Sequence, residues 1–235
     1  MNWRAWHQLK LRMITPREIS KNESGFTLIE LIVVVVIIGI LGAIAAPGWI
    51  GFTNNRRVSS ANDAVLQAIN EAKNKARKDK LAYSVSFRTE NNMPQIAVHP
   101  ASIDANSNDA VQINSMTNYW EFGTLSRDVD IKANQILIQT NIESKNKRLD
   151  PASFSTLPDS SNTQVSSQTI TFDHTGELAR QDDGSDPTLP LVVRVAVPNA
   201  SNSTQPLTST IRCIQVQTLL GSLLIGRRES ECPAS

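Results

Sequence analysis

The chain has few of the residues on which most catalytic and metal sites depend. It holds two cysteines and three histidines among 235 residues. His99 and His174 have no cysteine or acidic residue at the spacing of metal ligands. The sequence also lacks a G-x-S-x-G nucleophile motif, a glycine-rich phosphate loop and a paired catalytic cysteine and histidine. We therefore predict a protein that is not an enzyme and that uses no metal and no cofactor.

The chain also lacks a large excess of charge of either sign. Its formal net charge of +1 excludes a protein that binds nucleic acid through general basicity. The charge is unevenly spread, however. Residues 1–25 hold five basic side chains against two acidic ones, residues 54–80 hold seven against three, and residues 81–235 hold eleven against sixteen. The length suits one globular domain with appendages, so we expect a basic N-terminal stalk and a mildly acidic head.

One long hydrophobic run extends from Phe26 to Ala46 and is followed by Pro47-Gly48-Trp49. As a helix that rises about 1.5 Å per residue, the run is roughly 30 Å long, the thickness of a bilayer core. Its one charge is Glu30, and Trp49 suits the membrane interface at the far end. A cleaved secretory signal would have a shorter run, whereas a plain signal anchor remains compatible with the hydropathy.

Basic residues flank this run unevenly, and the asymmetry predicts its orientation. Five basic residues precede the run, whereas Arg56 and Arg57 are the only ones within about fifteen residues after it. We therefore expect a cytoplasmic N-terminus and a head that crosses the membrane. Cys213 and Cys232 would then meet an oxidising space and form a disulfide, worth about 3 kcal/mol for a loop of this length. In the cytoplasm they would be two free thiols.

The hexapeptide Gly25-Phe26-Thr27-Leu28-Ile29-Glu30 resembles the cleavage signal of type IV prepilins and type II secretion pseudopilins. The resemblance implies that a membrane peptidase cuts after Gly25 and that the new N-terminal residue, Phe26, is N-methylated. It also implies that Glu30 serves filament assembly and that Pro47, together with Gly48, bends the helix. The implied leader, residues 1–25, is longer than most in that family, and Met13 is an alternative start.

The implied partners are a prepilin peptidase/N-methyltransferase, other pilin or pseudopilin subunits and an inner-membrane assembly platform. The implied location is the inner, cytoplasmic membrane, with the head in the periplasm or outside the cell. Chemistry supports the role of Glu30. The amine created at Phe26 keeps its charge near neutral pH, since its reference pKa is about 8. A buried carboxylate costs much less when such a cation pairs with it, so the two groups could join neighbouring subunits.

The segment after the run has the period of an amphipathic helix. Its apolar residues recur three and four positions apart; they are Val58, Ala61, Val65, Ala68, Ile69, Ala72 and Ala76. We expect residues 26–52 to be the transmembrane half of one kinked helix and residues 53–81 the amphipathic half. The other face carries Lys73, Lys75, Arg77, Lys78 and Lys80. We interpret that face as solvated; acidic neighbours in a filament, phosphate head groups and DNA are the alternatives.

Residues 82–235 alternate between short apolar stretches and polar loops, which predicts about six to eight antiparallel strands packed on the helix, an α+β fold. The expected strands lie at Tyr83–Phe87, around Ile96 and Val98, at Trp120 and Phe122, within Val129–Ile142, at Ile170–Phe172, at Leu191–Val197 and at Ile211–Val216. Residues 219–225 could extend or pair with the last strand. We expect polar loops at 101–118 and 153–168, and we expect Asp173 to cap its own turn.

This head resembles the GspH/FimT family of minor pilins and pseudopilins at the junction near Leu81–Phe87, at Ile170–Gly176 and at the strand from Ile211. Some members bind DNA through a Gly-Arg-x-Arg stretch near the C-terminus. This chain has Gly221-Ser222-Leu223-Leu224 there, so DNA binding is not carried over. We predict a minor pilin-like subunit of a type IV pilus. The alternatives are a pseudopilin of a type II secretion system and a tip subunit for adhesion or DNA uptake.

Overall fold

A computed structural model describes residues 25–101, 117–120, 131–159, 168–179, 190–217 and 220–233. The chain divides into two compact units, the first ending at Ala46 and the second beginning at Pro47. Residues 1–24 of the predicted leader lie outside the described residues. The same holds for Phe122, for most of the predicted loop 101–118 and for part of the loop 153–168.

One helix, α1 (Leu28–Asp79), holds 52 residues and contributes to both units. In the first unit the described side chains of the helix, up to Ala45, are exposed. The helix does not end at Pro47 and Gly48, as the resumed periodicity predicts. A bend at these two residues stays a prediction.

In the second unit, α1 buries the apolar stripe that the sequence predicts. Six of the seven stripe residues are fully buried, and Ala68 is half-buried and packs against the same core. Alanine is frequent in the stripe because small side chains let a sheet approach the helix closely.

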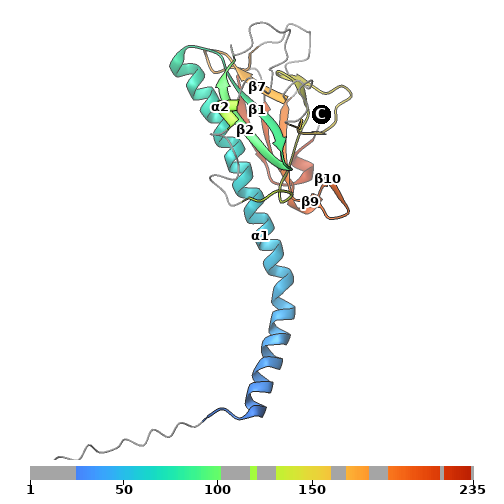
Figure 1. The fold of residues 1–235 in the computed structure, drawn as a ribbon. Helices are drawn as coiled ribbons and strands as arrows, with labels where there is room; N and C mark the ends of the chain where they lie inside the picture. The colour runs from blue at the N-terminus through green and yellow to red at the C-terminus, as the bar shows by residue number, and fades with distance from the viewer. Residues whose placement is uncertain are drawn as a thin grey trace, which may run out of the picture. The chain divides into compact units, whose positions relative to one another are not determined.

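Strand β1 (Tyr83–Glu90) is central in a three-stranded antiparallel sheet of order β2-β1-β7, with β2 (Met93–Pro100) and β7 (Gln168–Phe172). The β1–β2 hairpin turns through Asn91 and Asn92, both at positive φ, which is the conformation that a two-residue hairpin turn requires. In Figure 1 the three strands lie together beside the later part of α1.

A five-stranded antiparallel sheet of order β12-β11-β8-β3-β6 forms the other layer. Its strands are β3 (Leu137–Thr140), β6 (Ser155–Thr156), β8 (Leu191–Ala196), β11 (Arg212–Gln217) and β12 (Ser222–Gly226). Two small hairpins complete the strands, β4 (Ile142–Ser144) with β5 (Lys147–Arg148) and β9 (Pro198–Asn199) with β10 (Asn202–Pro206). Short helical turns are α2 (Thr117–Trp120), η3 (Thr208–Thr210) and η4 (Glu229–Glu231).

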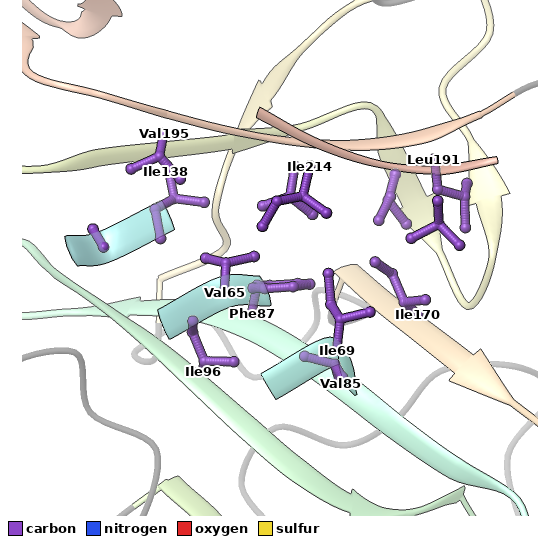
Figure 2. Close-up of a cluster of buried hydrophobic side chains, with 14 of the residues drawn as sticks. Val65, Ile69, Val85, Phe87, Ile96, Ile138, Ile170, Leu191, Val195 and Ile214 are labelled. Carbon is purple, nitrogen blue, oxygen red and sulfur yellow. The ribbon is translucent and has the colours of Figure 1, made fainter. Parts of the chain in front are cut away.

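The core lies where α1 and the two sheets converge. Figure 2 shows Val65 and Ile69 of the helix between the side chains of the two sheets. The three-stranded sheet contributes Val85, Phe87, Ile96 and Ile170, and the five-stranded sheet contributes Ile138, Leu191, Val195 and Ile214. Burying helix and sheets together stabilises the head, since each fully buried aliphatic side chain is worth roughly 1.5–3 kcal/mol. The predicted α+β fold is confirmed.

Several strand predictions need correction. Trp120 lies in α2, not in a strand; its ring is buried and carries the Arg88 guanidinium 4.4 Å from the ring centre. The range Val129–Ile142 does hold strands as predicted: its described residues include β3, which begins at Leu137 after a turn in which Asn134 has positive φ, and the first residue of β4. The predicted loop 153–168 contains β6.

The described part of the chain has twelve strands, more than the six to eight predicted. The strands that the sequence did not predict are β4, β5, β6 and β9, which are two or three residues long and too short to give a periodic pattern, and the polar five-residue strand β10. Residues 219–225 were expected either to extend the last predicted strand or to pair with it. Pairing is correct, because β12 lies largely in this range and pairs with β11.

Candidate cleavage and assembly site

Gly25, Phe26 and Thr27 precede the helix and have no regular secondary structure. Phe26 is exposed, and a side chain added at Gly25 would meet no described atom within 4 Å. A peptidase needs an extended, accessible backbone at the bond that it cuts. The bond between Gly25 and Phe26 lies in an exposed segment outside regular secondary structure, and Phe26 lies two residues before the helix begins.

Thr27 caps the start of α1. Its side-chain Oγ1 accepts a hydrogen bond from the Glu30 amide at 3.3 Å, and its carbonyl accepts one from the Leu31 amide at 3.2 Å. The segment Thr27-Leu28-Ile29-Glu30 has the pattern of a capping box, in which a threonine and a glutamate three residues later frame the first turn. This cap was missing from the sequence prediction, although the Thr-x-x-Glu spacing could have revealed it.

Glu30 lies in the first turn of α1, and its side chain is exposed. A carboxylate is favoured there because the unpaired amides at a helix N-terminus carry a partial positive charge. Among the described residues it has no ion-pair partner. Its carboxylate is therefore available to a cation from outside the described chain, and a free N-terminal amine is one such cation.

The helix beyond Glu30 presents apolar side chains on every side. From Leu28 to Ala45 it is long and apolar enough to cross a membrane, judged by length and composition. Soluble helices bury one stripe and expose the other. Here the large side chains from Leu31 to Ile44 are all at least half exposed, apart from the slightly more covered Val34. An apolar surrounding, such as a bilayer or a bundle of like helices, is compatible with such a surface.

Cys213 and Cys232 form a disulfide in the second unit, with their Cα atoms 5.8 Å apart, as the oxidising-compartment prediction requires. The bond joins β11 to the residue after η4. An ion pair between Arg194 and Glu229 at 3.4 Å holds the same segment, and the Arg194 guanidinium also lies over the Phe154 ring. Burial, opposed by the nearby Glu229, lowers the pKa of Arg194.

The basic face of α1 is not simply solvated. Lys73 Nζ donates to the carbonyls of Gly221 at 2.7 Å and Leu220 at 3.3 Å, and Arg77 Nε donates to the carbonyl of Thr175 at 2.9 Å. The two cations thus fasten turns of the head to the helix, which corrects the solvated interpretation at these positions. Desolvation, with the nearby Arg77, lowers the pKa of Lys73.

The turn that Arg77 contacts is capped by Asp173, as predicted. Asp173 Oδ1 accepts hydrogen bonds from the Thr175 hydroxyl at 2.6 Å, the Thr175 amide at 2.9 Å and the Glu177 amide at 3.1 Å. Burial works to raise the pKa of the carboxyl, but these hydrogen bonds outweigh it and hold the pKa below its ordinary value. Gly176 completes the turn at positive φ.

Fold and site together define a class of protein: an apolar N-terminal helix that fits a membrane, followed by an antiparallel α+β head closed by one disulfide. Residues 20–46 match the family described as the prokaryotic N-terminal methylation motif. This match supports a place in the type IV pilin and pseudopilin superfamily, whose members are processed by a prepilin peptidase and assemble with other pilins. No curated protein and no solved structure gives a significant match to the chain.

Proposed function

We propose that this chain is a minor subunit of a type IV pilus, processed at Gly25–Phe26 and built into a filament through its N-terminal helix. The match of residues 20–46 to the methylation motif carries the proposal. Two features of the site support it: the accessible bond before the helix and the unpaired Glu30 in its first turn. The proposal includes a head like those of the GspH/FimT family, and this part of it is based on the sequence motifs.

Processing creates the chemistry that assembly uses. Hydrolysis of the Gly25–Phe26 amide removes the basic leader, residues 1–25, and leaves a free amine on Phe26. Methylation of that amine adds a carbon but preserves its basicity, so the group stays cationic near neutral pH. The mature chain would then begin with a cation four residues before Glu30, just ahead of the Thr27 cap.

The Phe26 amine of one subunit would neutralise Glu30 of its neighbour. In an apolar bundle an unpaired carboxylate is expensive, and pairing recovers part of that cost. The pair would therefore set the axial register between subunits, because a shifted helix leaves both charges buried without partners. Residues 26–52 would supply the transmembrane half, residues 53–81 the amphipathic half and residues 82–235 the head.

The proposed topology has a cytoplasmic N-terminus and a head in the periplasm or outside the cell. The basic leader supports the first assignment and the disulfide between Cys213 and Cys232 supports the second. Peptidase, assembly platform and neighbouring subunits are the proposed partners. The missing Gly-Arg-x-Arg stretch counts against DNA as a further partner.

Mass spectrometry of the membrane form tests the proposal directly. The expected N-terminal residue is a methylated Phe26, and Gly25→Leu should leave full-length precursor in the membrane. A mature start after Ala46 would contradict the assignment. One deletion strain scored for pili, transformation and exoprotein release then separates roles: loss of pili alone supports the pilus, whereas loss of exoprotein release assigns the chain to a type II pseudopilus.

A further inference from the structure

Two exposed aromatic side chains follow the apolar run of α1. Trp49 is 71% exposed and Phe52 is 58% exposed, and their ring centroids lie 6.1 Å apart. The stretch that is long and apolar enough to cross a membrane ends at Ala45, four residues before Trp49. An indole suits the boundary between hydrocarbon and headgroups, because its ring is apolar and its N–H needs a polar partner.

Two arginines lie about one turn beyond the aromatic pair. Arg56 is exposed and Arg57 is half-buried, and among the described residues neither has an ion-pair partner. Between Glu30 and Asp63 the chain has no acidic residue, and these two arginines are its only charges there. Asp63 lies seven residues after Arg56, about 10 Å further from the aromatic pair along the helix axis. The helix next to the aromatic pair is therefore purely cationic.

The aromatic pair and Arg56 share the face of α1 that points away from the core of the head. Phe52 and Arg56 follow Trp49 by three and seven residues, which places all three on one face. Val58, the first buried residue of the apolar stripe, follows Trp49 by nine residues, about two and a half turns, and so lies on the opposite face. Helix side chains also lean toward the N-terminus, so Arg56 extends back toward the aromatic pair.

The order of side chains along α1 matches the layers of a bilayer. The apolar run, the aromatic pair and the arginines follow one another as hydrocarbon, interface and phosphate do. The helix rises about 10 Å from Trp49 to Arg56, and a headgroup layer is roughly 5–8 Å thick, so a side chain that leans back reaches the phosphates. Cations are uncommon on the translocated side of a span, and a lipid phosphate is a counterion that guanidinium groups bind well.

We propose that Trp49, Phe52, Arg56 and Arg57 form a binding surface for anionic phospholipid headgroups at the end of the membrane span. The guanidinium groups would donate hydrogen bonds to the lipid phosphate, and the aromatic pair would lie at the edge of the acyl chains. The surface would hold the subunit at a fixed depth until it is assembled. This inference rests on the proposed function only in placing residues 26–46 in the membrane.

Native mass spectrometry of the full chain in detergent, mixed with one phospholipid at a time, tests the inference. Phosphatidylglycerol and phosphatidylcholine with the same acyl chains differ in headgroup charge. The wild type should prefer phosphatidylglycerol several-fold, and Arg56→Gln/Arg57→Gln should reduce this preference by up to about thirty-fold, since each basic side chain near an anionic surface contributes about 1 kcal/mol. Arg56→Lys/Arg57→Lys should keep most of the preference. The basic leader is common to all variants, so the comparison isolates the two arginines.

Lys78→Gln/Lys80→Gln is the matched control, because it removes the same charge from exposed positions near the other end of the helix. It should leave the preference unchanged. An equal loss in the control would mean that total charge decides, and an unchanged preference in Arg56→Gln/Arg57→Gln would mean that the arginines do not bind lipid; either result overturns the inference. If the double variant does not accumulate, Arg56→Gln alone decides, because Arg56 is exposed.

Failure of this inference can be distinguished from failure of the proposed function. Alkaline washing of membranes should leave the wild-type chain and Arg56→Gln/Arg57→Gln in the membrane fraction, since the apolar run is unchanged. Release of the wild-type chain by the wash would contradict the membrane span and with it the proposed function. Retention of both chains without a lipid preference in the wild type would overturn only the lipid-binding surface.

Discussion

Gly226 lies opposite Cys213 in the β11–β12 pair, so close that a β carbon added at Gly226 would lie 2.6 Å from the Cys213 sulfur. The same β carbon would lie 2.8 Å from the Cys232 sulfur and 2.9 Å from the Glu231 carbonyl oxygen. Only glycine fits at position 226, because three atoms of the disulfide-linked segment occupy the space that a side chain would need.

Gly226→Ala should destabilise the head by about 1–3 kcal/mol, the usual cost of overpacking a filled site. Thermal unfolding of the purified full chain in detergent measures the effect. Gly51→Ala is the matched control, because a β carbon at Gly51 meets nothing within 4 Å. In a helix interior that change should be neutral or stabilising by roughly 0.5–1 kcal/mol. Similar melting temperatures for the two variants would contradict this account of Gly226.

Loss of the disulfide should release the C-terminal segment. The two cysteines are 19 residues apart, and closing a loop of this size is worth about 3 kcal/mol in the chain-entropy model. We expect Cys232→Ser to lower the unfolding temperature and to increase proteolysis after β12. Limited proteolysis followed by mass spectrometry locates the cuts. Two alkylatable thiols in the exported wild-type protein would show that the bond is absent in the cell.

Gly176 and Arg77 should be energetically coupled. Gly176 has φ of +80°, and an added β carbon would overlap the Arg77 side chain. Gly176→Ala should cost about 1–3 kcal/mol through backbone strain and this overlap. In Arg77→Ala the overlap disappears, so the double variant should be less destabilised than the sum of the singles. Strict additivity in denaturant unfolding would mean that the two residues do not interact.

Acid should weaken the turn that Asp173 caps. The folded-state pKa lies below the ordinary value of 3.8, so the contribution to stability is fully present above that value. It is lost as the pH falls through the depressed folded pKa, because a protonated carboxyl no longer accepts these hydrogen bonds as strongly. The stability difference between wild type and Asp173→Asn should therefore shrink as the pH is lowered from neutral to well below the ordinary value of 3.8. A stability difference that stays constant across that pH range would contradict this role of the Asp173 carboxylate.

Glu30→Ala should separate insertion from assembly. Removing the carboxylate makes the span more apolar, so the variant should insert and be cut at Gly25 as the wild type is. Its recovery in sheared filaments, relative to membranes, should fall because the neighbouring Phe26 amine loses its partner. The pair is worth several kcal/mol at most, so the loss could be partial. Equal recovery of the variant and the wild type would mean either that the subunit lies at the tip of the filament or that Glu30 has no role in assembly. Cross-linking to other subunits distinguishes these two explanations.

Periodicity predicted the elements that bury a regular face. The stripe from Val58 to Ala76 follows the helix period, and β1, β8 and β11 follow the strand period, so local sequence was sufficient. The β9–β10 hairpin was not predicted. It is polar and exposed along most of its length, and prolines lie at both of its ends, so no hydrophobic pattern marks it.

The contacts of charged side chains were the least predictable part of the site. Lys73 and Arg77 looked like members of a solvated face, yet Lys73 binds a carbonyl 148 residues further along the chain and Arg77 binds one 98 residues further along. Helical spacing shows which face a residue occupies but not which turn will reach it. The cleavage motif, by contrast, is local, and the structure adds to it the Thr27 cap.

The pairing of β1 with β7 joins Val85 to Ile170, and the helix stripe packs against residues as late as Val216. Contacts between residues so far apart form slowly, because the loop between them must close first. During synthesis the N-terminal helix is therefore complete long before its packing partners exist. The five-stranded sheet is complete only after nearly the whole chain has been made, so a product truncated before β8 would keep the apolar helix but lack most of that sheet's contribution to the core.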